Sequence, residues 1–67
     1  MLTYLVTDHK KFNEVEDIEF FNTSQIWGGM FHGEITIHLN DGVEHFKHGA
    51  YDIKHFIQKY GFIISEE

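Results

Sequence analysis

The histidines are the residues of this chain whose type and spacing could bind a metal ion. There are six His, and four of them lie between residues 26 and 48. If Asp41-Gly42 forms a two-residue hairpin loop, His38 and His45 lie directly opposite each other, with Cβ atoms about 4.5–5.5 Å apart. Two such imidazoles could hold Zn²⁺ or Ni²⁺, and Glu34 could add a carboxylate. Because a tetrahedral site needs three or four protein ligands, the alternative interpretation is a polar, solvent-facing sheet surface.

Acidic residues form the second group that could take part in binding. The candidates for contact with a partner are Glu14, Glu16, Asp17, Glu19, Asp41 and Glu44. The first four are close neighbours in the chain, so they predict a solvated acidic face rather than a catalytic acid and base. Such a face attracts a basic partner and steers its approach. The alternative interpretation is that the acidity only keeps a small protein in solution.

The single Trp and a Met-Phe pair flank two glycines just before the expected hairpin. Trp27 precedes Gly28-Gly29, which indicate a turn or bulge, and Met30 and Phe31 follow them. Met and aromatic side chains inside a polar rim are typical anchors of protein–protein interfaces. In one interpretation these three side chains fill the core of a chain with little apolar area. In the other, some of them are exposed beside the acids and contact a partner.

Catalytic chemistry has little support in the residues present. The chain contains no Cys, which excludes disulfides and thiolate metal sites. No glycine pattern resembles a phosphate-binding loop, and Ser24 and Ser65 lack the strand-turn-helix setting of an activated serine. A core this small leaves little room for a substrate pocket of about 300–1,000 Å³. We therefore expect a protein that is not an enzyme and that has no catalytic residues and no cofactor.

The elements that would position these residues follow from the spacing of apolar side chains. The spacing of apolar residues predicts strands at residues 2–7, 18–22, 34–39, 43–48 and 62–65, with a helix as the weaker alternative for residues 12–22. Residues 8–11 are predicted to form a polar turn, and residues 22–25 a turn or bulge. An amphipathic helix that ends at Gly61 is predicted by the apolar stripe Ile53, Phe56, Ile57 and Tyr60.

The Asp41-Gly42 loop also predicts which residues of the hairpin face each other. It pairs Asn40 with Val43, Leu39 with Glu44, His38 with His45 and Ile37 with Phe46. The apolar face then consists of Ile35, Ile37, Leu39 and Phe46, and the polar face of Thr36, His38, His45 and Lys47. A slip by one residue would move every side chain to the opposite face, so the apolar pattern favours this register. A type I′ turn at this loop requires positive φ at Gly42.

Together these elements predict an α+β fold. Residues 1–67 are expected to form a single domain in the order ββββαβ, with an antiparallel sheet of about four to five strands and one C-terminal helix packed on one face. A chain of 67 residues buries only about 60% of the surface that its unfolded form exposes, so its stability depends on dense packing, a metal or a partner. Seven Phe, three Tyr and one Trp provide material for dense packing.

The charge balance argues against nucleic acid as a direct partner. Eleven acids and five bases give a formal net charge of −6, and all five bases are Lys. Nucleic-acid-binding proteins normally carry a basic stripe, and Arg makes many of their bidentate contacts with phosphate and guanine. The chain has no apolar run of about 20 residues and no segment typical of a signal peptide. We therefore expect a cytoplasmic protein that binds neither nucleic acid nor a membrane.

The order of segments from Val15 to Ile64 resembles that of LytTR-type DNA-binding domains. The segments "VEDIEFF", "GEITIHLNDGVEHF" and "IKHFIQKYGFI" follow the order of a "DI" strand, a "DG" hairpin, a helix and a "GFI" strand in that family. The resemblance implies the same succession of strands and helix. This chain is shorter than LytTR domains and lacks the basic residues that their DNA contact needs, so no site residue is carried over.

These observations predict a small acidic protein-binding module. The expected role is inhibition, in which the module occupies a basic nucleic-acid-binding site of another protein, as anti-CRISPR, anti-restriction or repair-inhibitor proteins of phages and mobile elements do. The expected contacts are the acids named above with Trp27, Met30 and Phe31. One alternative is a homodimeric structural or regulatory protein without an inhibitory role. Another is a histidine-based metal-binding protein that uses His38 and His45.

Overall fold

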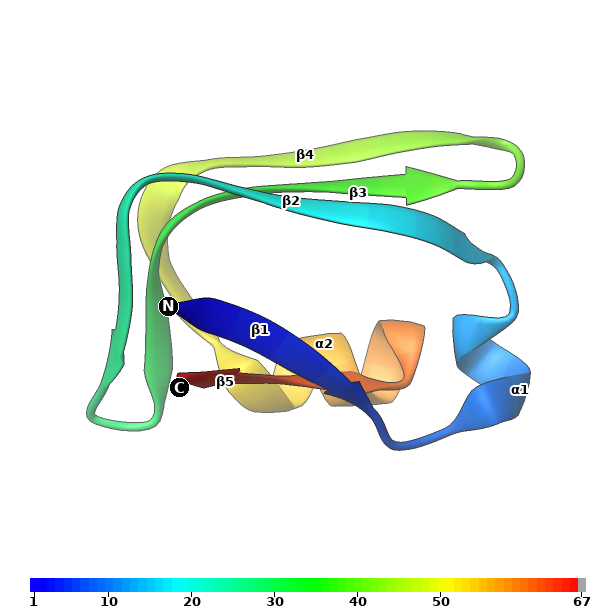
Figure 1. Ribbon diagram of the computed structural model, residues 1–67, viewed down its shortest axis with the longest axis horizontal. Coiled ribbons are helices and arrows are strands. Elements are labelled where there is room, and N and C mark those ends of the chain that lie inside the picture. Colours follow the sequence, from blue (N-terminus) through cyan, green and yellow to red (C-terminus); the bar gives the residue numbers. More distant parts are fainter. Residues whose placement is uncertain (67) are drawn as a thin grey trace.

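The computed structural model describes residues 1–66, which form five strands and two short helices (Figure 1). In chain order the elements are β1 (Leu2–Val6), α1 (His9–Phe12), β2 (Val15–Trp27), β3 (Met30–Leu39), β4 (Gly42–Asp52), α2 (Ile53–Tyr60) and β5 (Phe62–Glu66). The predicted α+β fold and the ββββαβ order are confirmed, and α1 is an addition to them.

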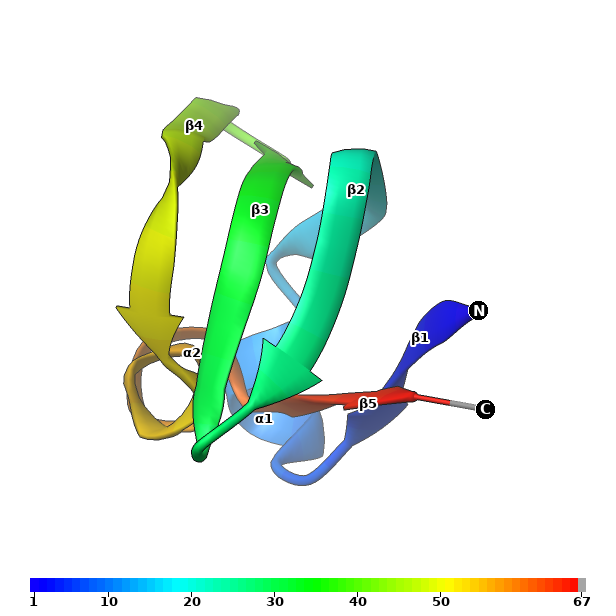
Figure 2. The ribbon, with the colours of Figure 1, turned by 90° about the vertical axis from the view of Figure 1, so that its left-hand side faces the viewer.

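The strands divide between two antiparallel sheets. β2, β3 and β4 form a three-stranded sheet in that order, and β1 pairs with β5 in a two-stranded sheet. Figures 1 and 2 show the three-stranded sheet on one side of the molecule, with α2 and the β1–β5 pair beneath it. The three-stranded sheet therefore has one face toward the core and one face away from it.

The three-stranded sheet bends in its middle, as Figure 1 shows. The β2–β3 register shifts after Phe21, and the β3–β4 register shifts after Gly33. Bulges leave residues of one strand unpaired and so bend it. Asn22 and Gly33 have positive φ angles of 62° and 149° at these places. The predicted irregularity at residues 22–25 is confirmed, and β2 continues beyond it to Trp27.

The predicted register of the β3–β4 hairpin is wrong. Leu39 pairs with Gly42 rather than with Glu44, so the two loop residues are Asn40-Asp41. Gly42 begins β4, and it is not among the positive-φ glycines of residues 1–66. A shift of two residues leaves every side chain on its own face, so the apolar pattern could not distinguish the two registers. The two successive positive φ angles of a type I′ turn occur instead at Gly28-Gly29, at 63° and 72°.

Residues 8–11, predicted as a polar turn, are instead the N-cap and first residues of α1. The Asp8 carboxylate accepts hydrogen bonds from two backbone N–H groups of the helix, at 3.1 and 3.3 Å. The ring of Phe12 lies 5.4 Å from that of Tyr4 and 6.0 Å from that of Phe62. A four-residue helix is too short to show an apolar period, and it depends on this cap and this packing.

α2 confirms the helix predicted from the apolar stripe. The carboxylate of Asp52 caps its N-terminus by accepting the backbone N–H of Lys54 at 2.9 Å. Gly61 ends the helix with a left-handed backbone conformation. Phe56 and Tyr60 are the buried residues of its apolar face. The sequence pattern therefore correctly identified both the helix and the face that packs on the sheet.

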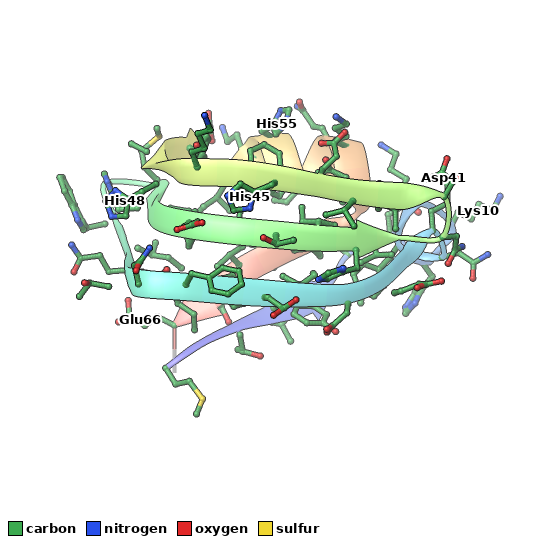
Figure 3. The ribbon with its side chains drawn as sticks, turned by 90° about the horizontal axis from the view of Figure 1, so that it is seen from above. Lys10, Asp41, His45, His48, His55 and Glu66 are labelled. Carbon is green, nitrogen blue, oxygen red and sulfur yellow. The ribbon has the colours of Figure 1, made fainter. Side chains whose placement is uncertain are left out.

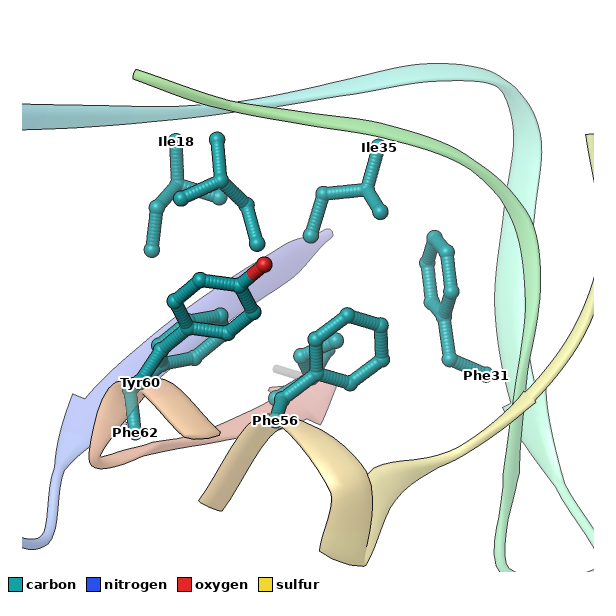
Figure 4. Close-up of a cluster of buried hydrophobic side chains, with 8 residues drawn as sticks. Ile18, Phe31, Ile35, Phe56, Tyr60 and Phe62 are labelled. Atoms are coloured by element: carbon teal, nitrogen blue, oxygen red, sulfur yellow. The ribbon is translucent and has the colours of Figure 1, made fainter. Parts of the chain in front are cut away.

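The core lies between the three-stranded sheet and the elements beneath it (Figure 4). Its buried apolar residues are Ile18, Phe31, Ile35, Ile37, Phe56, Tyr60, Phe62 and Ile64. Phe56 of α2 is central in this cluster. Its ring centroid lies 6.2 Å from that of Phe31, 5.3 Å from that of Phe46 and 5.8 Å from that of Phe62. Since these neighbours belong to β3, β4 and β5, one side chain of α2 joins both sheets.

Candidate functional site

The face of the three-stranded sheet that points away from the core carries most of the residues suited to binding. Strand alternation places the chain neighbours of the buried Ile18, Ile35 and Ile37 on this side. We define the outer face as Asp17, Glu19, Phe21, Gln25, Trp27, Met30, His32, Glu34, Thr36, His38, Val43 and His45. Figure 3 views this side from above, with Asp41 at one end of the sheet and His48 toward the other.

Three outer-face residues form a group of possible metal ligands, here called the Asp17 cluster: Asp17, Glu19 and His38. Asp17 pairs directly with His38 across β2 and β3, and Glu19 lies two residues further along β2. Nε2 of His38 contacts Oε1 of Glu19. One ligand atom from each residue lies within 4.8 Å of the other two. The backbone N–H of Ile18 donates to Oδ1 of Asp17 at 2.9 Å, which helps to orient that carboxylate.

A second imidazole–carboxylate pair, His45 with Glu34, lies on the same face. Nε2 of His45 is 3.0 Å from Oε2 of Glu34, and its Nδ1 is 2.7 Å from the hydroxyl of Thr36. The side-chain amide of Asn22 donates to Oε1 of Glu34 at 2.7 Å. Both ring nitrogens of His45 and both oxygens of Glu34 therefore have partners within the protein.

The prediction that His38 and His45 face each other is wrong. The β3–β4 register pairs His38 with Val43 and His45 with Thr36. A metal site made of two directly opposed imidazoles is therefore not formed. Each imidazole contacts a carboxylate, so protonation of either one creates an attractive ion pair rather than repulsion between two imidazolium groups.

Trp27 is exposed beside the β2–β3 turn, whereas Phe31 is not. Trp27 retains 59% of its accessible surface, and its ring stacks on that of His32 with centroids 3.9 Å apart and planes 7° apart. Met30, which pairs with Trp27 across the turn, is half-buried. Phe31 is completely buried, so it belongs to the core and cannot contact a partner in this fold. Consecutive residues of a strand point to opposite faces, which separates Met30 from Phe31.

Phe21 was not among the predicted contact residues, yet it is 38% exposed on the outer face. The alternation of β2 contained the signal for it. The ring of its neighbour Phe20 lies 5.9 Å from that of buried Phe31, so Phe21 must point the other way. Val43 of β4, also exposed, adds a second apolar group on this face.

Three of the predicted acids lie near the β3–β4 turn. We call them the turn-end acids: Glu14, Glu16 and Asp41, all exposed. The backbone N–H of Asn40 donates to the carbonyl of Glu14 at 2.9 Å, which places Glu14 beside that turn. Glu16 lies at the register shift that follows Val15. The acids of residues 14–19 are therefore divided between two locations.

Glu44 lies on the core side of β4, where it joins the sheet to α2. Its two carboxylate oxygens accept hydrogen bonds from Nζ of Lys59 at 3.0 and 3.1 Å, and Oε2 also accepts the hydroxyl of Tyr60. The hydrogen bonds from Tyr60 and Lys59 lower the pKa of Glu44 below its ordinary value of 4.5. Burial and the adjacent carboxylate raise the pKa of Tyr60 above its ordinary range. Because Glu44 is already paired within the protein, it is the acid least suited to contact a partner.

We expect Glu44→Gln to destabilise the protein near neutral pH and to flatten the acid side of its stability curve. The folded-state pKa of Glu44 is lowered, so its carboxylate stabilises the fold above the unfolded pKa of 4.5, and this stabilisation is lost as the pH falls through the folded pKa. The expected loss at neutral pH is about 1 kcal/mol, because the pair is partly exposed. Urea unfolding midpoints measured across the acid range check this, with Glu16→Gln as the control for loss of one charge. Parallel pH curves for wild type and Glu44→Gln would contradict it.

The candidate site is a surface and not a pocket, since residues 1–66 enclose no ligand-sized cavity. Neither α1 nor α2 is long and apolar enough to cross a membrane.

Comparison of the chain with protein-family models, with curated proteins and with solved structures found no match in any of the three. The resemblance in segment order to LytTR domains therefore receives no support from a family model.

Proposed function

We propose that this protein is a small acidic binding module that inhibits a nucleic-acid-acting protein by occupying its basic site. The observation that carries the proposal is the separation of charge across the fold. Four of the five lysines belong to α1 and α2, which lie beneath the three-stranded sheet (Figure 1), and the fifth, Lys47, is exposed on β4. Asp17, Glu19 and Glu34 lie on the outer face. A basic surface would therefore approach the sheet from its outer side.

The acids of the outer face keep their negative field toward solvent. Among residues 1–66, the ion pairs of Glu19 and Glu34 are with His38 and His45, and no ion pair joins Asp17 to a lysine. An imidazole neutralises a carboxylate only when it is protonated. These acids therefore act with the net charge of −6 to attract and orient a basic partner.

Apolar side chains on the same face supply the anchor that electrostatic steering alone does not. Trp27 and Phe21 are exposed there, and Trp is among the residues that most often dominate the energy of an interface. The stack of His32 on Trp27 holds the indole ring in one orientation, which lowers the entropy lost on binding. The outer face therefore combines charge for attraction with aromatic surface for affinity.

The class of target follows from this charge pattern. The nucleic-acid channel of a nuclease is a basic surface, and it attracts acidic groups. In size and charge this protein resembles the inhibitors that phages and mobile elements direct against CRISPR, restriction or repair enzymes. Such a target places the inhibitor in the cytoplasm. By binding to the channel of the nuclease, the inhibitor would displace nucleic acid without binding nucleic acid itself.

The test is competition for nucleic acid on a panel of CRISPR, restriction and repair nucleases. Fluorescence polarisation of a labelled duplex measures how much nucleic acid each nuclease releases as this protein is added. For a nuclease that responds, the variant Asp17→Asn/Glu19→Gln/Glu34→Gln is expected to compete about 3- to 150-fold less well, because three exposed charge pairs at about 0.2–1 kcal/mol each contribute about 0.6–3 kcal/mol.

The matched control removes the same number of charges from the turn-end acids, as Glu14→Gln/Glu16→Gln/Asp41→Asn. It should compete nearly as well as wild type if the outer face forms the contact. Equal losses in the two variants would show that only net charge matters. If no nuclease of the panel releases nucleic acid, the inhibitory role is wrong.

A further inference from the structure

We propose that the Asp17 cluster is a Zn²⁺ site on the outer face, formed by Asp17, Glu19 and His38. Two carboxylates and one imidazole are a donor set that divalent zinc accepts, with water in the remaining position. The sequence pattern pointed to facing histidines, but the register of the sheet brings a different set of ligands together. The site shares Asp17 and Glu19 with the proposed contact surface, but zinc binding can be measured on the isolated protein without the proposed partner.

The distances within the cluster suit one shared ion. Its three ligand atoms lie within 4.8 Å of one another. Two ligand atoms that each bind zinc at about 2.0–2.2 Å are separated by about 3–4 Å. Asp17 and His38 therefore need only small side-chain rotations to reach a common ion, while Glu19 and His38, now in direct contact, must separate slightly. No change of the backbone is required.

The backbone that carries these ligands is held from below by the core. Ile18 lies between Asp17 and Glu19 in the chain, and it pairs across the strands with Ile37, the neighbour of His38. Both isoleucines are buried. A pair of buried residues on one face thus fixes the spacing of the three ligands on the other, and such rigid support reduces the entropy cost of binding a metal.

Among residues 1–66, no lysine neutralises the two carboxylates of the cluster. Glu44 is compensated by Lys59, whereas among residues 1–66 no ion pair joins Asp17 or Glu19 to a lysine. Two carboxylates beside a neutral imidazole carry two negative charges, which a divalent cation neutralises. The negative charge of the two carboxylates therefore matches the charge of one zinc ion, and this supports the site independently of the distances between the ligands.

Nε2 of His38 must be free of a proton before it can bind zinc. In the free protein Nε2 of His38 shares a hydrogen bond with Oε1 of Glu19. To bind zinc, Nε2 must offer its lone pair, so a neutral imidazole carries its proton on Nδ1 instead, and a protonated imidazole releases one proton to solvent. Zinc replaces the proton between these two atoms. Zinc affinity should therefore fall as the pH is lowered.

The outer face contains its own matched control in His45 and Glu34. This pair has the same two side-chain types at a similar separation, but no second carboxylate completes it. Both ring nitrogens of His45 are also occupied, by Glu34 and Thr36. Zinc should therefore select the Asp17 cluster over this pair.

Isothermal titration of untagged protein with ZnCl₂ near neutral pH tests the site. We expect one ion per chain, with affinity weakened about tenfold or more by His38→Gln and by Asp17→Asn, and unchanged by His45→Gln. Far-UV circular dichroism shows that each variant is folded. As a second measurement that needs no variant, zinc should shift the side-chain ¹⁵N resonances of His38 in NMR spectra and leave those of His45 in place. Absence of zinc binding by the wild type, equal losses in His38→Gln and His45→Gln, or equal shifts of both histidines would each overturn the proposal.

Discussion

Phe56→Ala is expected to remove most of the stability of this protein. The side chain is 0% exposed, and its ring packs against rings from β3, β4 and β5. Replacing a buried Phe by Ala costs about 3–5 kcal/mol, because contacts are lost and a cavity remains. A domain of 67 residues is stabilised by about 3–10 kcal/mol, at about 0.05–0.15 kcal/mol per residue. Since the two ranges overlap, the variant should be largely unfolded or close to unfolding.

Urea unfolding followed by far-UV circular dichroism measures this loss. Phe21→Ala is the matched control, because it removes the same side chain from the outer face, where Phe21 is 38% exposed. Its expected cost is about 1 kcal/mol or less. Equal midpoints for the two variants would show that the core is not centred on Phe56.

Gly33→Ala is expected to cause the second large loss of stability. Gly33 has a φ angle of 149°, which side-chain-bearing residues rarely adopt. A Cβ at this position would lie 2.4 Å from Oγ and 2.8 Å from Cα of Ser24, which belongs to the neighbouring strand. The hydroxyl can rotate away, but the backbone Cα cannot. Strain of about 1–3 kcal/mol and overpacking of about 1–3 kcal/mol together predict a loss of about 2–6 kcal/mol.

Gly29→Ala separates strain from close packing. Gly29 also has a positive φ, of 72°, but a Cβ there would meet no atom within 4 Å. Its expected cost is about 1–2 kcal/mol from the left-handed backbone alone. Thermal or urea unfolding of both variants checks the difference. If Gly33→Ala were as mild as Gly29→Ala, the close approach of β2 and β3 at the bend would be wrong.

The spacing of apolar residues identified the five strands and α2, but not α1, and it indicated the direction in which most side chains point. Ile53, Phe56, Ile57 and Tyr60 indicated α2 because their spacing matches one face of a helix. The alternation of Ile35 and Ile37 with polar residues indicated β3 in the same way. These patterns are local, since they depend only on the geometry of a single helix or strand.

The pairing of residues across neighbouring strands could be established only from the tertiary structure. The apolar pattern allowed two hairpin registers that differ by two residues, and both keep Ile35, Ile37 and Phe46 on one face. The observed register pairs His38 with Val43, and so separates it from direct contact with His45. Local alternation carries no information about this choice, because it is made by the loop and by packing across the whole sheet.

The Asp17 cluster likewise exists only in three dimensions. Asp17 and Glu19 are sequence neighbours, but His38 reaches them through the β2–β3 pairing, which includes a register shift after Val15. The exposure of Trp27 and the burial of Phe31 have a similar origin, because they depend on which side of the bent sheet α2 covers. Local spacing determined the strands and the helix, whereas pairing between distant segments determined the candidate sites, since contacts between strands depend on a register that no single strand encodes.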